Sequence, residues 1–135
     1  MAVRYFKYKR KITKDSVSEY KYMPQMQLQA PVGFEQIAEM IQQKSTMSRG
    51  DIMGVLAELE PSISVMLENG HPVDLGLIGT FIPGIEVVSV DKPEDVTHRL
   101  IKRFKVLFKP SLYFKNRFKH VNYELVDNVV RVTKS

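Results

Sequence analysis

The sequence predicts an α+β fold, in which a helical hairpin lies under a three-stranded antiparallel sheet with an extended β-arm, and a β-hairpin precedes this domain. Two observations predict it. Apolar residues recur with the 3.6-residue period of helices between residues 33 and 69, and the segments on either side alternate with the two-residue period of strands. A third observation concerns charge: the helical middle is acidic, and both flanks are basic.

The N-terminal segment predicts a β-hairpin. Residues 2–12 alternate as a half-buried strand does, residues 13–16 read Thr-Lys-Asp-Ser and supply turn chemistry, and residues 17–26 return as a second strand. Pro24 and Pro31 bracket the connector and make a helix or a central strand there unfavourable. We therefore assign residues 1–32 to an accessory N-terminal β-hairpin and its connector.

Two helices follow, because the apolar spacing changes at Gly33. One apolar helical face of about three turns is made by four residues, Phe34, Ile37, Ala38 and Ile41. Ser48 is a favourable N-cap for a second, longer helix, with Asp51 three residues on. Asn69-Gly70 is a typical helix stop.

The predicted sheet begins after this stop. Residues 71–81 read as a turn and a strand, residues 85–90 extend the strand outward, and residues 91–95 form a polar turn. The returning strand starts at Arg99. Its alternation places one set of side chains toward the core, namely Phe104, Val106 and Phe108, and the opposite set toward water or phosphate, namely Arg103, Lys105, Leu107 and Lys109.

The C-terminal part predicts a short basic helix and a last strand. Ser111, after Pro110, can cap a helix that runs through Lys119. Residues 123–132 have strand character, so residues 122–135 are assigned to a C-terminal strand and tail.

The distribution of charge points to a polyanionic partner. Residues 99–119 contain no Asp or Glu, and their bases are Arg99, Lys102, Arg103, Lys105, Lys109, Lys115, Arg117 and Lys119. Such segregation raises the local potential more than the net charge of +5 suggests. The alternative is that lysine-rich strands are solvated edges that prevent aggregation.

Residues 73–81, which read Val-Asp-Leu-Gly-Leu-Ile-Gly-Thr-Phe, resemble the V-x-L-x-G-F-G-T-F strand entry of the bacterial histone-like HU/integration host factor family. Residues 108–111, Phe-Lys-Pro-Ser, are similar to that family's return into its final helix, and residues 68–70, Glu-Asn-Gly, stand where the family has E-x-L-x-x-G. The resemblance covers residues 33–121. The preceding strands look like the extended HU-like variants of Bacteroides-type bacteria.

The resemblance implies the IHF-like DNA-binding fold, an interwound homodimer or paralogue heterodimer, and largely sequence-nonspecific binding of double-stranded DNA in the cytoplasm, at the nucleoid. In the family a β-arm from each subunit follows the minor groove, and a proline at its tip wedges between base pairs. The family's tip usually reads R-N-P. Here Lys92-Pro93 stands among Asp91, Glu94 and Asp95, so a plain turn proline is the alternative.

The residues expected to contact DNA combine this resemblance with the basic run. They are Arg99, Lys102, Arg103, Lys105 and Lys109 on the arm and sheet, Lys115, Arg117 and Lys119 near the last helix, and Lys92 and Pro93 at the tip. Lys7, Lys9 and Arg10 are weaker candidates. A further alternative is that aromatics interleaved with bases, such as Tyr5, Phe6 and Tyr8, stack on single-stranded bases instead of filling a core.

No enzymatic pattern is recognisable, and we expect no catalytic residue, no cofactor, no metal and no small-molecule substrate. The chain has no cysteine, and its three histidines, His71, His98 and His120, match no metal-ligand spacing. The sequence contains no run of about 18 apolar residues, so it predicts no membrane helix. The second function considered is a dimeric HU-fold protein-interaction module that has lost general DNA bending.

Overall fold

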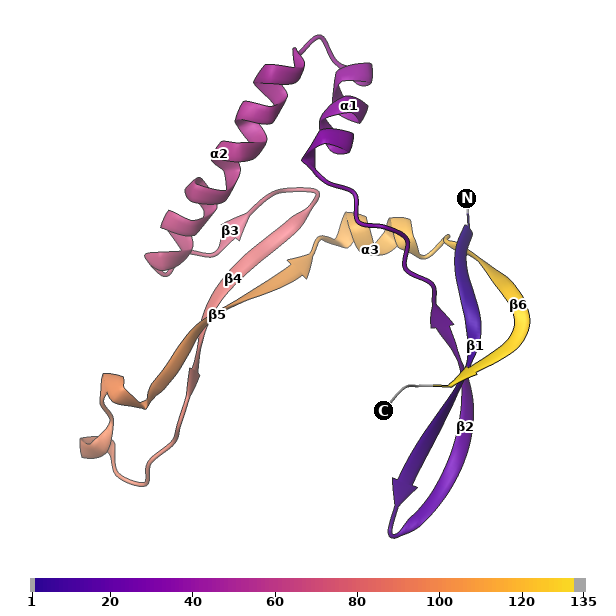
Figure 1. The fold of residues 1–135 in the computed structure, drawn as a ribbon. Helices are drawn as coiled ribbons and strands as arrows, with labels where there is room; N and C mark the ends of the chain where they lie inside the picture. Colours follow the sequence, from indigo (N-terminus) through magenta and orange to yellow (C-terminus); the bar gives the residue numbers. More distant parts are fainter. Residues whose placement is uncertain (1, 133–135) are drawn as a thin grey trace. The chain divides into compact units, whose positions relative to one another are not determined.

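The computed structural model describes residues 2–132, in two compact units. One unit holds residues 32–117, and the other holds residues 2–31 together with residues 118–132. Residue 1 of the predicted N-terminal segment and residues 133–135 of the predicted C-terminal tail lie outside the described residues. Figure 1 labels the α-helices and strands of both units.

The first unit to be described, residues 32–117, begins with the predicted helical hairpin. Helix α1 spans Phe34–Lys44 and helix α2 spans Arg49–Glu68. Ser48 caps α2 as the sequence predicts, because its Oγ accepts a hydrogen bond from the Asp51 backbone N–H at 3.1 Å. At the other end Gly70 has a φ of +84°, the left-handed conformation in which glycine ends a helix without a steric penalty.

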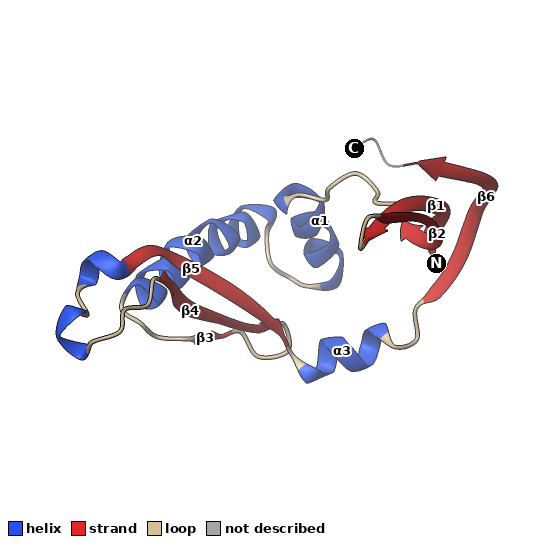
Figure 2. Ribbon diagram, turned by 90° about the horizontal axis from the view of Figure 1, so that it is seen from below, coloured by secondary structure: helices blue, strands red, loops and turns tan. Residues whose placement is uncertain are grey.

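A three-stranded antiparallel sheet follows the hairpin, with the order β3-β4-β5. Its strands are β3 (Val73–Asp74), β4 (Gly79–Val87) and β5 (Ile101–Pro110). Helix α2 contacts β3 and β4, so the hairpin lies against this sheet. The two long strands β4 and β5 extend beyond the short strand β3 as an arm, and Figure 2 shows helical turns at the end of this arm.

These turns are 3-10 helices, Pro93–Asp95 and His98–Leu100. Helix α3, Leu112–Phe118, starts directly after β5. Ser111 is its N-cap, since its Oγ accepts a hydrogen bond from the Phe114 backbone N–H at 3.1 Å. The same hydroxyl donates to the Leu77 carbonyl, and the Ser111 N–H donates to the Ile78 carbonyl at 3.1 Å, so the start of α3 is fixed to the turn before β4.

The second unit contains a different three-stranded sheet, with the order β2-β1-β6. Strands β1 (Ala2–Lys14) and β2 (Val17–Met26) form the predicted hairpin, turning at Asp15 and Ser16, which both have positive φ. Strand β6, Asn122–Val132, pairs with β1 in parallel. The sequence predicts the N-terminal hairpin and the C-terminal strand as separate pieces, whereas the structure joins them in one sheet.

Few side chains are buried in the described part of the chain. Ala38, Ile52 and Leu67, all on the helical hairpin, are the buried hydrophobic residues among those described. Large apolar side chains of the sheet remain half exposed, including Phe104, Val106 and Phe108. The single chain therefore leaves much of its apolar sheet surface uncovered.

Candidate nucleic-acid interface

The register of β4 and β5 sorts their side chains onto two faces, because residues directly opposite each other in an antiparallel pair share a face. One face carries the pairs Phe81–Phe108, Pro83–Val106 and Ile85–Phe104. The Phe81 and Phe108 rings lie 5.1 Å apart, and Phe81 and Val106 line an apolar groove together with Leu56, Leu59, Ile63 and Leu67 of α2. This face therefore points toward the helical hairpin.

The opposite face is basic. It carries the pairs Thr80–Lys109, Ile82–Leu107, Gly84–Lys105 and Glu86–Arg103. All residues of β5 on this face are exposed to solvent. The predicted separation of Phe104, Val106 and Phe108 from Arg103, Lys105, Leu107 and Lys109 is thus what the register shows.

Glu86 is a partner that the sequence analysis did not assign. It lies opposite Arg103, and its Oε2 accepts from the Arg103 Nε at 2.5 Å. The alternation of Ile85 and Val87 in the sequence is the signal that could have placed Glu86 on the basic face. Among residues 2–132, neither Lys105 nor Lys109 has a carboxylate within ion-pair distance, so these two lysines carry the unneutralised charge of the face.

Lys109 of β5 and Lys115 of α3 line the same polar hollow. Thr80, Pro110 and Ser111 also line it. Asp74 lines it as well, and the Oδ1 of Asp74 accepts a hydrogen bond from the Gly76 backbone N–H at 2.8 Å. Two lysines and a threonine hydroxyl around one hollow suit a phosphate oxygen, which accepts hydrogen bonds from all three.

The remaining predicted residues do not line this hollow. Lys102 is the extra residue at the register shift between Glu86 and Val87, and Arg99 belongs to the second 3-10 turn. Lys92 precedes the first turn, which Pro93 begins. Arg117 lies in α3. Lys119 follows α3 in the other unit, so it is not placed relative to the β4–β5 face.

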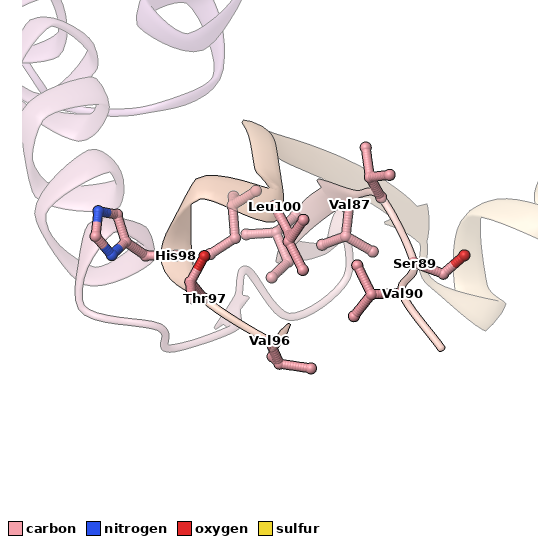
Figure 3. A pocket seen from close by; sticks show the side chains of 10 residues that line it. Val87, Ser89, Val90, Val96, Thr97, His98 and Leu100 are labelled. Carbon is pink, nitrogen blue, oxygen red and sulfur yellow. The ribbon is translucent and has the colours of Figure 1, made fainter. Parts of the chain in front are cut away.

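The end of the arm is apolar and acidic. An open hollow of about 560 Å³ lies there, lined by Val87, Val90, Val96, Leu100 and others shown in Figure 3. Glu94 and Asp95 belong to the 3-10 turn that begins at Pro93. Carboxylates repel DNA phosphates. The carboxylates of the tip therefore disfavour DNA binding there, whereas the basic face of β4 and β5 favours it.

Two further features bear on other classes of site. Among residues 2–132, no three His, Asp or Glu side chains are grouped closely enough to hold a metal ion. No helix in that range is both long and apolar enough to span a bilayer.

Comparisons with known proteins identify the family and a solved structure of similar fold. Residues 1–124 match the HU-HIG family, described as an HU domain fused to wHTH, Ig, or glycine-rich motif. A crystal structure from Bacteroides vulgatus ATCC 8482, described as a putative bacterial DNA binding protein, is similar with a TM-score of 0.63 and 11% sequence identity. The similarity covers 94% of this chain and 50% of that one, so this chain spans about half the length of that protein. No curated protein matches significantly.

Proposed function

The chain belongs to the HU-HIG family, and from that membership we propose that the basic face of β4 and β5 binds double-stranded DNA through its phosphates, largely without sequence preference. The observation that carries the proposal is the position of Lys105 and Lys109. Both lie on the face turned away from the helical hairpin, exposed and without an ion-pair partner among the described residues. The description of the Bacteroides vulgatus protein as DNA-binding supports the same function.

The arrangement suits phosphates better than bases. Lysine is a point charge on a flexible stem, and it positions a protein on the backbone without reading sequence. The one arginine on the face, Arg103, is engaged by Glu86, so its guanidinium is less available for bidentate contact with guanine. Lys115 adds a third ammonium group beside Lys109. Lys102, Arg99 and Arg117 are further phosphate contacts in this proposal.

We further propose that two copies of the chain assemble through the apolar face. Only three hydrophobic residues of the described chain are buried, whereas Phe104, Val106 and Phe108 stay 41–50% exposed above the helical hairpin. An apolar face of this kind is typical of a subunit whose core is completed by a symmetric partner. The partner is another copy or a paralogue, and the dimer acts as a non-enzymatic component of the nucleoid.

A second candidate function is a protein-interaction module on the same scaffold. The arm tip favours it, because Val87, Val90 and Val96 are exposed there next to Glu94 and Asp95. An exposed apolar surface in a segment that also carries carboxylates suits a protein partner better than a DNA groove. The two functions differ in one property: only the first requires that the dimer bind duplex DNA.

Binding of a fluorescent 30-base-pair duplex, measured by anisotropy at low salt, tests the proposal. We expect Lys105→Glu/Lys109→Glu to lower the affinity by at least about a hundredfold, since two phosphate contacts become two repulsions. The matched control is Lys14→Glu/Lys21→Glu, which changes the net charge equally on the other sheet. It should retain most of the affinity.

Equal losses in both double variants would show that only the net charge matters. A folded wild-type protein that leaves the duplex unbound at low salt would overturn the DNA-binding function and favour the interaction module. Circular dichroism of each variant controls for folding.

A further inference from the structure

The sheet β2-β1-β6 has one face on which lysines of β1 lie across from tyrosines of β2. On this face the register places Lys7 opposite Pro24, Lys9 opposite Tyr22, and Lys11 opposite Tyr20. Tyr5 lies opposite Met26 and beside Leu125, and Tyr123 of β6 lies beside Val3. We call this surface the tyrosine–lysine face; it consists of Tyr5, Lys7, Lys9, Lys11, Tyr20, Tyr22 and Tyr123.

Three of its four tyrosine rings are largely exposed and do not fill a core, whereas Tyr5 is half-buried. Tyr20, Tyr22 and Tyr123 are 55%, 65% and 69% exposed. Apart from the last residue of α3, the described part of this unit consists of strands and connecting segments, so it holds no helix that could cover the face. These rings are therefore available to a ligand, and their conformation does not depend on burial in the unit.

The face is also free of carboxylates in the paired register. Glu19 lies opposite Ile12, and Glu124 lies beside Arg4, so both belong to the opposite face. Asp127 lies in the irregular part of β6 and pairs with Arg131, whose guanidinium covers the Phe6 ring on that opposite face. The tyrosine–lysine face thus presents only positive charge, which suits a polyanion.

One cation–π contact and one hollow place aromatic rings and ammonium groups together on this face. The Lys9 Nζ lies 4.2 Å from the centre of the Tyr20 ring, which holds an ammonium group directly beside an aromatic surface. Tyr5, Lys7, Tyr22, Pro24 and Val130 line an open hollow of about 580 Å³, a size typical of small-molecule pockets. A ring and an ammonium group therefore occur together at two places on the face.

The spacing of the rings selects the form of the polyanion. Tyr20 and Tyr22 are two residues apart on β2, which corresponds to about 6.8 Å along a strand. Stacked bases in a duplex are separated by only about 3.4 Å along each strand. Bases that stack on successive tyrosines must therefore belong to an extended strand whose bases are unpaired.

We propose that the tyrosine–lysine face binds single-stranded DNA, with bases stacked on Tyr20, Tyr22 and the Tyr5 hollow and with phosphates neutralised by Lys7, Lys9 and Lys11. The choice of DNA over RNA rests on the function proposed above; the preference for unpaired bases does not. The face is separate from the β4–β5 surface and differs from it in chemistry, because the basic side of β4 and β5 has no exposed ring in register.

The test uses the full chain and a fluorescein-labelled dU12 oligonucleotide, with binding measured by anisotropy. Base stacking on an aromatic side chain contributes about 1–3 kcal/mol per base, so Tyr22→Thr should weaken binding by roughly 5- to 140-fold, and Tyr20→Thr similarly. Threonine keeps the strand preference of the exposed positions. Lys9→Gln/Lys11→Gln should also weaken binding and flatten its salt dependence by about 1.4 in log–log slope.

The matched control is Lys14→Gln/Lys21→Gln, which removes the same charge from the opposite face of the same hairpin. It should bind dU12 within about threefold of the wild type. Lys105→Glu/Lys109→Glu should bind dU12 normally while losing the duplex, which separates failure of this inference from failure of the proposed function.

Three results would overturn the inference. One is no binding of dU12 by the folded chain at low salt. Another is an equal loss in the two lysine pairs. The third is an unchanged affinity for dU12 in both tyrosine variants. If these variants change the oligomeric state of the protein and not its affinity for dU12, the face binds a second copy of the chain. Tighter binding of the ribonucleotide U12 would reassign the face to RNA.

Discussion

Two β-ribbons of this chain distribute their charges in opposite ways. In the β4–β5 ribbon the lysines occupy one face and the phenylalanines the other, and the apolar face lies against a helical hairpin. In the β1–β2 ribbon bases occur on both faces: Lys9 and Lys11 on one, Arg10 and Lys21 on the other. No helix lies over this second ribbon within the described part of its unit.

The difference shows how burial imposes a pattern on a sequence. A strand with one buried face must alternate apolar and polar residues, because a slip by one residue would expose its whole apolar set. A ribbon without a buried face has no such constraint, so rings and charges can lie together on the same face, as Tyr20 and Tyr22 do with Lys9 and Lys11. The pattern of β4 and β5 is typical of a ribbon that packs one face on a core and exposes a basic face. The pattern of β1 and β2 is consistent with the single-strand binding proposed for the tyrosine–lysine face.

The largest effect that sharpens this comparison is expected at Gly79, where β4 begins. Gly79 has a φ of +148°, and a Cβ there would clash with the Lys109 carbonyl oxygen and touch the Phe108 ring. Because backbone atoms of β5 cannot move aside without loss of pairing, Gly79→Ala should lower the free energy of unfolding by about 3 kcal/mol. Denaturant unfolding measures it.

The control is Gly84→Ala in the same strand. A Cβ there meets the flexible Lys105 side chain at 3.4 Å, and Gly84 has no positive φ. Its cost should stay below about 1 kcal/mol. Equal stability of the two variants would contradict the close approach of β4 and β5 at Gly79.

The next effect concerns the two faces of β5. Phe104 and Leu107 are similarly exposed in the single chain, at 50% and 63%, but they lie on opposite faces. If a second copy covers the apolar face, Phe104→Asp buries a carboxylate in the interface and should weaken dimerisation by about a hundredfold or more, whereas Leu107→Asp should leave it unchanged. Sedimentation velocity over a concentration series distinguishes them.

A monomeric wild-type protein at micromolar concentration would refute the proposed dimer directly. A dimer that Leu107→Asp disrupts and Phe104→Asp does not would place the interface on the wrong face.

The smallest effect is expected at the arm tip. Pro93 begins a 3-10 turn that continues into Glu94 and Asp95, so its neighbours repel phosphates. Pro93→Ala should therefore change duplex affinity by less than about threefold and leave any DNA bend intact, as measured by energy transfer between the duplex ends. Loss of a bend in this variant would instead identify Pro93 as an intercalating wedge.

Local patterns were sufficient to predict much of the fold. Ser48 with Asp51 predicted the start of α2, and the structure confirms the cap. The alternation of Phe104, Val106 and Phe108 predicted which side of β5 faces the helices, because successive side chains of a strand point to opposite faces. Arg103, Lys105 and Lys109 could be assigned to the opposite side for the same reason.

Pairing between distant segments could not be predicted. Strand β6 pairs with β1 across more than a hundred residues, and nothing in either strand specifies a parallel partner; the pairing also shifts register between Tyr5 and Lys7. The ion pair of Arg103 with Glu86 depends on the β4–β5 register, which the sequence did not specify. The tyrosine–lysine face likewise became visible only when the register placed Tyr20 and Tyr22 with Lys9 and Lys11.

The central claim is that Lys105 and Lys109 each neutralise a DNA phosphate, and the salt dependence of duplex binding tests it most directly. The slope of log affinity against log salt concentration, compared between the wild type and Lys105→Gln/Lys109→Gln, should become shallower by about 1.8, since each phosphate contact contributes about 0.9. An unchanged slope in a folded variant would mean that neither lysine touches a phosphate, and would contradict the account.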